Sequence, residues 1–278
     1  MISILQLGTV DYATGLRLQQ QLVALRKEEK IGDVLLLLEH SPVITLGRNA
    51  KAANVVASPE LLARRGVELF ECDRGGDVTF HGPGQIVGYP IFDLRGFPCV
   101  EKAVLGNDHV GTAALGRPVE RSSTVRKHIG VVDFVRRLEE VLIRTSADFS
   151  IPTKRLHGLT GVWTETDAKL AAIGVHISRF VTSHGFALNV NPDLGYFNLI
   201  IPCGITTNPV TSMQRELGRP LDLNAVAESI SRNFGTVFQS QILWVDTLDA
   251  LLGRTVGVPM KPPTELRKIH KEDDTTWA

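Results

Sequence analysis

The sequence predicts a mixed fold of the α/β or α+β class, in which one sheet carries helices on its surface. The apolar run Val34–Leu38 is typical of a strand buried on both faces. Two segments, Val131–Thr145 and the stretch after Asp222, carry apolar residues at helical spacing. Strands and helices that mix along one chain in this way favour a single domain with a mixed sheet and flanking helices.

The N-terminal part of the chain begins with a strand and a helix. Ile2–Leu7 alternates well enough for a strand, and Gly15–Arg26 carries leucines at helical spacing. The triplet Ser58-Pro59-Glu60 supplies an N-cap residue, a proline at the first helical position and an acidic first turn, which predicts a short helix to Arg65. Further strands are expected at Val67–Glu71, Gln85–Phe92, Lys169–Ile177 and Ser183–Val190.

The helix expected at Val131–Thr145 is strongly amphipathic. Its apolar face holds Val131, Phe134, Val135, Leu138, Val141 and Leu142, and its opposite face holds Arg136, Arg137, Glu139 and Glu140. The helix after Asp222 carries a similar apolar stripe. We therefore expect both helices to pack on the sheet through their apolar faces.

Composition and charge argue against several classes of function. The chain has 278 residues with 43% hydrophobic content, enough for one sizeable core or two small ones. Its 30 basic and 30 acidic side chains cancel, so we expect neither nucleic acid nor a membrane as a partner. No apolar run reaches transmembrane length, and the N-terminal MISILQLGTV lacks the basic start and cleavage site of a signal peptide.

The cysteines favour a reducing compartment. Cys72, Cys99 and Cys203 are odd in number and widely spaced, and no Cys-x-x-Cys pair occurs. A disulfide framework or a zinc ribbon needs paired cysteines at closer spacing, so the sequence predicts a cytoplasmic protein.

The most informative segment is the run Arg74–Gln85, RGGDVTFHGPGQ. Glycines let the backbone approach a ligand closely, and Pro83 fixes its own φ angle. Taken alone, Gly-Gly or Gly-Pro-Gly indicates only a tight connection between strands. Because the same run also places a cation, an imidazole and an amide beside exposed backbone, we interpret it as a functional loop.

This run, together with Tyr89-Pro90 and Asp93-Leu94, resembles the lipoyl(octanoyl) transferase family. The family pattern is Arg-Gly-Gly, two variable residues, Thr, an aromatic residue and His-Gly-Pro-Gly-Gln, followed by Tyr-Pro and Asp-Leu, and every position is matched. The resemblance resumes from Gly158 to about Arg215. It implies a catalytic domain of the biotin/lipoate protein ligase type.

The resemblance also implies how the chain is divided. One catalytic domain would span 1–278, with its core at about 30–220 and a C-terminal extension at 241–278. Between Pro98 and Ile129 the sequence is rich in Gly, Arg, Ser, Thr and Lys, without a sustained apolar period. Since the family normally reaches the long helix through a much shorter link, we expect 99–128 to be a surface insertion.

Two residues receive catalytic roles from the resemblance. Cys203 lies in Pro202-Cys203-Gly204; by itself a free cysteine is most often a small buried hydrophobe, but the family has an acylated cysteine at this Pro-Cys-Gly. Lys169 opens the segment KLAAIG, where the family has a lysine that pairs with the cysteine. A neighbouring cation stabilises a thiolate, and a neutral lysine accepts a proton. Cys72 has no such match and is interpreted as packing.

The implied reaction is a two-step acyl transfer. Cys203 attacks the thioester of octanoyl-acyl carrier protein, and a lysine of a lipoyl domain then takes the acyl group from the enzyme thioester. The implied acceptors are the lipoyl domains of 2-oxoacid dehydrogenase complexes and the glycine cleavage H protein. Because the thioester is already activated, no ATP, metal or other cofactor is expected.

The acyl chain needs an apolar slot, and the resemblance assigns its walls to three segments. They are Arg74, Gly75, Gly76, Asp77, Val78, Thr79, Phe80 and His81, then Ala172, Ile173 and Gly174, and then Gly185, Phe186 and Ala187. For His81 we favour binding or loop order over proton transfer. His176 and His184 flank a turn, but no third ligand has suitable spacing, so no metal site is expected there.

Two other functions remain as alternatives. An ATP-dependent lipoate or biotin protein ligase activates a free acid as an adenylate and needs no cysteine nucleophile, so Cys203 and Lys169 argue against it. A non-catalytic protein that binds acyl carrier protein or lipoyl domains would be marked by the loss of Cys203 or Lys169, and both are present.

Overall fold

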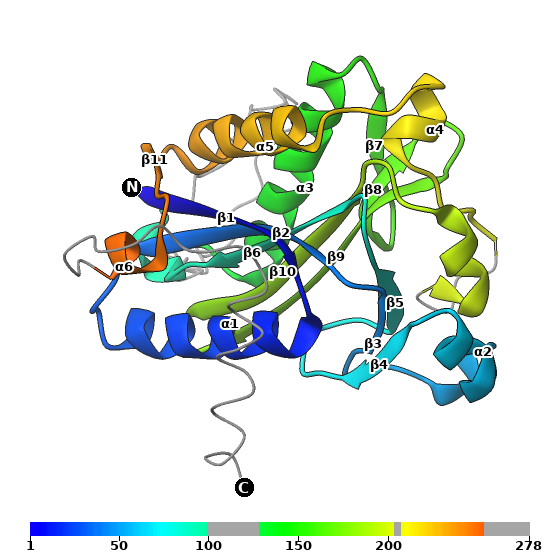
Figure 1. Cartoon of the computed structure of the whole chain (residues 1–278). Helices are drawn as coiled ribbons and strands as arrows, with labels where there is room; N and C mark the ends of the chain where they lie inside the picture. The colour runs from blue at the N-terminus through cyan, green and yellow to red at the C-terminus, as the bar shows by residue number, and fades with distance from the viewer. Residues whose placement is uncertain (99–127, 203–206, 253–278) are drawn as a thin grey trace, which may run out of the picture.

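A mixed eight-stranded sheet forms the centre of the molecule (Figure 1). The computed structural model describes residues 1–98, 128–202 and 207–252. The strand order is β11-β1-β2-β6-β10-β9-β8-β7; β11, β1 and β2 are parallel, and the other neighbours are antiparallel. The strands are β1 (Ile2–Val10), β2 (Asp33–His40), β6 (Gln85–Ile91), β7 (Thr153–Leu156), β8 (Leu159–Thr164), β9 (Lys169–Ser178), β10 (Val181–Asn189) and β11 (Ile242–Trp244).

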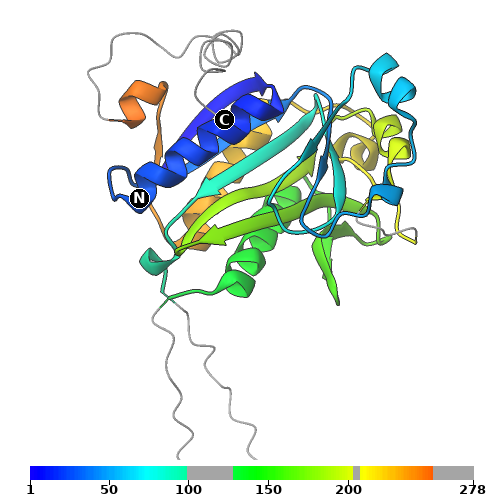
Figure 2. The same ribbon diagram turned by 90° about the horizontal axis from the view of Figure 1, so that it is seen from below.

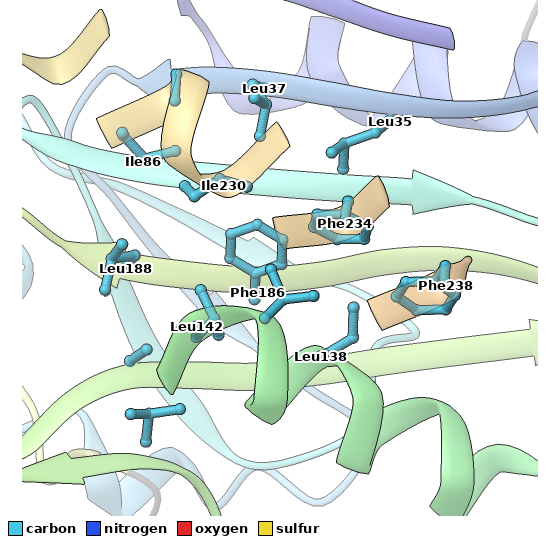
Figure 3. Close-up of a cluster of buried hydrophobic side chains, with 14 of the residues drawn as sticks. Leu35, Leu37, Ile86, Leu138, Leu142, Phe186, Leu188, Ile230, Phe234 and Phe238 are labelled. Carbon is cyan, nitrogen blue, oxygen red and sulfur yellow. The ribbon is translucent and has the colours of Figure 1, made fainter. Parts of the chain in front are cut away.

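Helices cover both faces of this sheet. α1 (Tyr12–Lys27) lies on one face, while α3 (Val131–Asp148) and α5 (Leu223–Phe238) lie together on the other (Figure 1). Figure 2 looks onto the α1 face, with α3 and α5 behind the sheet. Figure 3 shows the core beneath α3 and α5, where the rings of Phe186 and Phe234 stack with centroids 6.0 Å apart. The predicted mixed fold class is confirmed.

The layered arrangement explains the unbroken apolar run in β2. Leu35 and Leu37 belong to the core beneath α3 and α5, whereas Leu36 and Leu38 belong to the core against α1. Successive side chains of a strand point to opposite faces, so a strand with helices on both sides needs apolar residues at every position.

A second, three-stranded sheet stands at one end of the main sheet (Figure 1). It consists of β3 (Val43–Leu46) between β4 (Glu68–Glu71) and β5 (Val78–His81). β5 corrects the prediction that Arg74–Gln85 is a loop throughout. All four of its residues are buried and pair with β3, so the glycine-rich run is two turns separated by a strand.

Short helices connect the strands. Ser58 caps α2 (Pro59–Arg64) by accepting a hydrogen bond from the Leu61 N–H, with a proline in the first turn, as predicted. The others are η1 (Ala52–Asn54), η2 (Leu94–Gly96), η3 (Leu194–Leu199), α4 (Met213–Leu217) and α6 (Leu248–Leu251). Helices this short show no apolar periodicity, which is why the sequence did not predict them.

The helix α3 differs at two positions from the predicted division into an apolar and a charged face. Glu139, expected on the charged face, is fully buried, and its carboxylate accepts hydrogen bonds from Arg136 Nη1 at 2.6 Å, Arg155 Nε at 3.0 Å and the Gly161 N–H at 3.2 Å. The strands β7 and β8 pack against this side of α3, and a carboxylate buried there is tolerated because it is paired. Val131, expected in the core, opens the helix and is 50% exposed.

The two segments predicted to lie outside the catalytic core differ in their relation to the fold. Nearly all of the insertion predicted at 99–128 is outside the described residues, but its ends adjoin, since the Ile129 N–H donates to the Phe97 carbonyl at 3.1 Å. In the extension predicted at 241–278, β11 joins the main sheet beside β1, and 253–278 lie outside the described residues. No helix within the described ranges is long and apolar enough to cross a membrane.

Candidate active site

A narrow slot of about 50 Å³ lies where the small sheet meets the main one. β5 and the loop at 74–76 form one wall, and β9 and β10 form the other, with β6 and the start of α1 behind them. In the β9–β10 pair, Ala172 lies opposite Ala187 and Gly174 lies opposite Gly185. These small residues leave room between the walls for a thin, unbranched ligand.

Most of the residues predicted to bind substrate line this slot. They are Arg74, Gly75, Gly76, Thr79, His81, Ala172, Ile173, Gly174, Gly185, Phe186 and Ala187. Ile173 and Phe186 contribute mainly backbone, because their side chains pack in the core beneath α3 and α5.

Asp77, Val78 and Phe80 do not line the slot, and the alternation of side chains along β5 explains two of them. Thr79 and His81 face the slot, whereas Val78 and Phe80 pack in the core of the small sheet. Asp77 instead fixes the turn before β5, where its carboxylate accepts a hydrogen bond from the Val78 N–H at 2.8 Å.

Arg74 builds the wall of the slot through its hydrogen bonds. Its guanidinium donates to the carbonyl oxygens of Thr45 at 2.6 Å, Asp77 at 2.6 Å and Gly75 at 3.1 Å. Its Cδ lies 3.4 Å from the point where a Cβ on Gly174 would stand. Arg74 therefore uses its charge to hold the loop against β3, and its aliphatic stem lies beside the slot.

Glycines allow the two walls to approach each other. A Cβ on Gly174 would stand 2.6 Å from the Gly75 carbonyl oxygen of the opposite wall, and within the main sheet a Cβ on Gly185 would collide with the Gly88 carbonyl of β6. The Gly75 N–H also donates to the Val175 carbonyl at 3.1 Å, which ties the loop to β9. Any side chain at these positions would force the backbone segments apart.

Four lining residues were not predicted from the sequence, namely Tyr12, Val87, Tyr89 and His184. Tyr89 is part of the Tyr-Pro pair of the motif, and His184 precedes Gly185, so nearness to predicted residues was an available signal. Tyr12 begins α1, far from the motif in sequence, and only the fold brings it to the slot.

A cluster of buried rings lies behind the slot. The His40 Nδ1–H donates to the Val10 carbonyl at 2.8 Å, and its Nε2 accepts from the Tyr89 hydroxyl at 2.6 Å, which is the tautomer this network assigns. Burial lowers the pKa of His40 to about 4 and, together with nearby His40, the pKa of His81 to about 3. Burial also raises the pKa of Tyr89 well above its usual range. These rings are therefore uncharged at neutral pH and suit an apolar ligand.

His81 begins a chain of hydrogen bonds that links β5 to β10. Its Nδ1–H donates to Gln85 Oε1 at 2.7 Å, the Gln85 amide donates to Asn189 Oδ1 at 2.8 Å, and the Asn189 amide donates to the Thr211 carbonyl at 3.0 Å. These successive hydrogen bonds hold the strand ends in a fixed relation. His81 thus orders the wall it lines.

Lys169 lies at one end of the slot, where β9 begins. A small cavity continues the slot there: it shares Thr79, Ala172 and Ala187 with the slot, and Lys169 lines it. Lys169 is 8% exposed, and its Nζ lies 5.1 Å from the ring centroid of Trp163. An ammonium is attracted to the face of an indole ring, so this contact fixes the position of the lysine.

Cys203 lies outside the described residues, but the residues on both sides of it approach Lys169. Pro202 lines the same small cavity as Lys169. On the other side, the Lys169 N–H donates to the Pro209 carbonyl at 2.7 Å, and the Thr211 N–H donates to the Lys169 carbonyl at 3.0 Å. The chain therefore leaves and re-enters the described fold next to Lys169.

The remaining candidate residues have other surroundings. Cys72 is partly buried beside β3, and Cys99 lies outside the described residues. Both histidines at the β9–β10 turn bond to Asp73, His176 through Nδ1 at 2.6 Å and His184 through Nε2 at 2.7 Å. In the described part of the chain, no group of three or more His, Cys, Asp or Glu side chains is arranged to hold a metal ion.

The fold is that of a lipoate protein ligase catalytic domain. The structure resembles a bipartite lipoate protein ligase from Thermoplasma acidophilum with a TM-score of 0.60 at 13% identity, over 90% of each chain. It also resembles lipoate-protein ligase A bound with ATP, with a TM-score of 0.61 at 13% identity, over 100% of this chain and 97% of the other. At such low identity the likeness concerns the fold alone, and it confirms the expected fold class.

The chain belongs to the lipoyl protein ligase A/B catalytic domain family, whose model matches residues 11–112 and 121–235. It is 57% identical over 275 residues to an octanoyltransferase from Koribacter versatilis, covering 98% of both chains. An octanoyltransferase from Acidobacterium capsulatum is 50% identical over 259 residues, covering 91% of this chain and 96% of the relative. The family resemblance seen in the motifs is confirmed.

Proposed function

We propose that this chain is an octanoyltransferase, an acyltransferase that moves an octanoyl group from acyl carrier protein to a lysine of a lipoyl domain. Relatives of that name, 57% and 50% identical over most of the chain, support the proposal. The observation that carries it is the narrow slot that leads to Lys169, with Pro202, the neighbour of Cys203, lining the space at the same end. Such a site suits a straight acyl chain whose carbonyl carbon lies near a thiol and an amine.

In the first half-reaction, the Cys203 sulfur attacks the carbonyl carbon of the octanoyl thioester. The new carbon–sulfur bond forms to the enzyme, the bond to the pantetheine sulfur of the carrier breaks, and the carrier leaves as its thiol. The proton that this thiol gains comes from Cys203 by way of Lys169. A covalent intermediate divides the transfer into two easier steps.

In the second half-reaction, the amine of the acceptor lysine attacks the enzyme thioester. A carbon–nitrogen bond forms, the bond to the Cys203 sulfur breaks, and the amine proton passes through neutral Lys169 to restore the thiol. The ring face of Trp163 attracts Lys169 whenever the lysine carries its charge. A thioester is activated already, so this chemistry needs no ATP.

The slot residues bind the tail by removing it from water. Burial of each methylene contributes about 0.8 kcal/mol, and the uncharged rings behind the slot do not oppose it. The acceptors in this proposal are the lipoyl domains of 2-oxoacid dehydrogenase complexes and the glycine cleavage H protein. The proposal includes a cytoplasmic setting, on the sparse and unpaired cysteines of the sequence.

A transfer assay tests the proposal. Purified protein is mixed with octanoyl-acyl carrier protein and an unmodified lipoyl domain, without ATP, and the mass of the lipoyl domain is measured. We expect a gain of one octanoyl group, which Cys203→Ala abolishes and Cys72→Ala largely preserves. Modification that requires free octanoate and ATP would instead identify a ligase.

A further inference from the structure

One end of the slot is closed by the side chain of His184, which is called the end wall below. A larger hollow lies directly behind this end wall. This hollow has a volume of about 550 Å³, against about 50 Å³ for the slot. Within the described residues, His184 is the side chain that lines both spaces. The imidazole side chain is 4% exposed, so it fills the point where the two spaces would otherwise join.

The order of the three spaces follows the strands. Along β10, Ala187 borders both the Lys169 cavity and the slot, Gly185 lines the slot, His184 borders the slot and the hollow, and Ser183 lines the hollow. From Ala187 to His184 the strand advances about 10 Å at about 3.3 Å per residue. An extended octanoyl chain that starts near Lys169 would reach the His184 end with its methyl group.

Hydrogen bonds hold the wall in place. His184 Nε2 lies 2.7 Å from Asp73 Oδ1, and the His184 N–H donates to Gln19 Oε1 at 2.8 Å. The ring of Tyr89 meets the imidazole edge to face, with centroids 6.5 Å apart. Asp73 and Tyr89 hold the imidazole, and Gln19 holds the backbone that carries it, so the ring cannot move aside for a methyl group without losing these contacts.

We propose that His184, held by Asp73, is the residue that limits the length of the acyl chain, by closing the slot against the hollow behind it. The inference rests on the proposed octanoyl transfer and deepens it. Beyond the wall, Leu16, Val23 and Val181 line part of the hollow, so a longer alkyl tail would meet apolar surface once the wall is removed. The structure thereby assigns substrate length to a residue far from the chemistry.

The backbone conformation of His184 makes His184→Gly the most informative variant. His184 has φ = 54°, in the left-handed region that glycine adopts freely, so glycine removes the wall without adding backbone strain. His184→Asn serves as a second variant, because asparagine tolerates this region and is smaller than histidine. His176→Ala is the matched control: it removes the other histidine of Asp73, but His176 does not line the slot.

The experiment offers each protein an equimolar mixture of hexanoyl-, octanoyl-, dodecanoyl- and tetradecanoyl-acyl carrier protein and measures the acyl groups transferred to a lipoyl domain. One methylene too many in a closed pocket is discriminated about tenfold or more, so we expect His184→Gly to raise the dodecanoyl-to-octanoyl ratio at least about tenfold. His184→Asn should raise it less, and His176→Ala should leave it as in the wild type.

Each failure has a separate meaning. A wild type that transfers no octanoyl group would contradict the proposed function. Normal octanoyl transfer with an unchanged ratio in folded His184→Gly, or in His184→Asn if the glycine variant does not fold, would overturn the role of His184 alone. An equal rise in His176→Ala would also overturn it, because a histidine that does not line the slot would then affect chain length as much as His184 does.

Discussion

Lys169 is surrounded by groups that restrict where its ammonium can lie. Its backbone is held on both sides by Pro209 and Thr211, and its Nζ lies over the ring of Trp163. Gly161 lies close by, and a Cβ there would stand 3.1 Å from the Lys169 Cε. At the residue scale, the lysine is therefore a positioned group rather than a solvated surface charge.

Substitution of Lys169 separates its two proposed tasks. A nearby cation stabilises a thiolate, so Lys169→Met should slow alkylation of Cys203 by iodoacetamide at neutral pH and move the rate profile to higher pH. Lys169→Arg keeps the charge but cannot give up its proton, so it should retain more thiol reactivity and still fail at turnover. Equal alkylation rates in both variants and the wild type would show that Cys203 and Lys169 do not interact.

The buried imidazole of His40 should make stability depend on pH. Burial lowers its pKa from 6.5 to about 4, so between these values the unfolded chain binds a proton that the folded protein does not. The stability that comes from neutral His40 is thus complete above about pH 6.5 and is lost as the pH falls through about 4. His81 acts in the same direction, down to about 3.

Urea unfolding at several pH values between about 4 and 7 measures this effect. His40→Gln should reduce the slope of unfolding free energy against pH by about 1.4 kcal/mol per pH unit, the value for one proton. His157, which is exposed, provides the control variant His157→Gln, with a slope like that of the wild type. If His40→Gln leaves the slope unchanged, His40 does not titrate with the proposed shift.

Among the helices and strands, the sequence predicted those that are marked by a local pattern of residues. The apolar run of β2 and the stripe of α3 follow from periodicity, and the start of α2 follows from its N-cap residue Ser58. β5 escaped prediction because its residues lie between glycines, and its strand state comes from pairing with β3. Glu139 was placed on the wrong face of α3 because only the packing of β7 and β8 shows that side to be buried.

The residues of the candidate site also fall into those that the sequence predicted and those that only the tertiary structure reveals. The motif identified the wall from Arg74 to His81, and the resemblance supplied the small residues of β9 and β10. Tyr12 could not be found, since only the packing of α1 on the sheet brings it to the slot. His184 looked like one of a pair of turn histidines, and its contact with Asp73 depends on the tertiary structure.

The segment 99–127 gives a prediction about an element outside the described residues. Its ends adjoin through the Phe97–Ile129 hydrogen bond, and the family match is interrupted at 113–120. Loop closure changes by only about 0.6 kcal/mol for each doubling of length. Replacing 99–127 by a short Gly-Ser link should therefore change the melting temperature and octanoyl transfer little. A large fall in melting temperature would show that the segment contributes to the packed fold.

In the whole molecule, the three layers of the domain and its small sheet have separate roles. α3 and α5 bury one face of the main sheet and leave the other face of β9 and β10 to form the slot with β5. The slot then points toward Lys169, where the chain on either side of Cys203 returns to the fold. We propose that the protein in this arrangement carries an acyl group on Cys203.

The most direct test is the intact mass of the protein after mixing with octanoyl-acyl carrier protein in the absence of acceptor. We expect a single octanoyl adduct, which peptide mapping assigns to Cys203 and which disappears when an unmodified lipoyl domain is added. Cys203→Ala should form no adduct. An adduct on Cys72 or Cys99, or transfer to the lipoyl domain by Cys203→Ala, would show that Cys203 does not carry the acyl group.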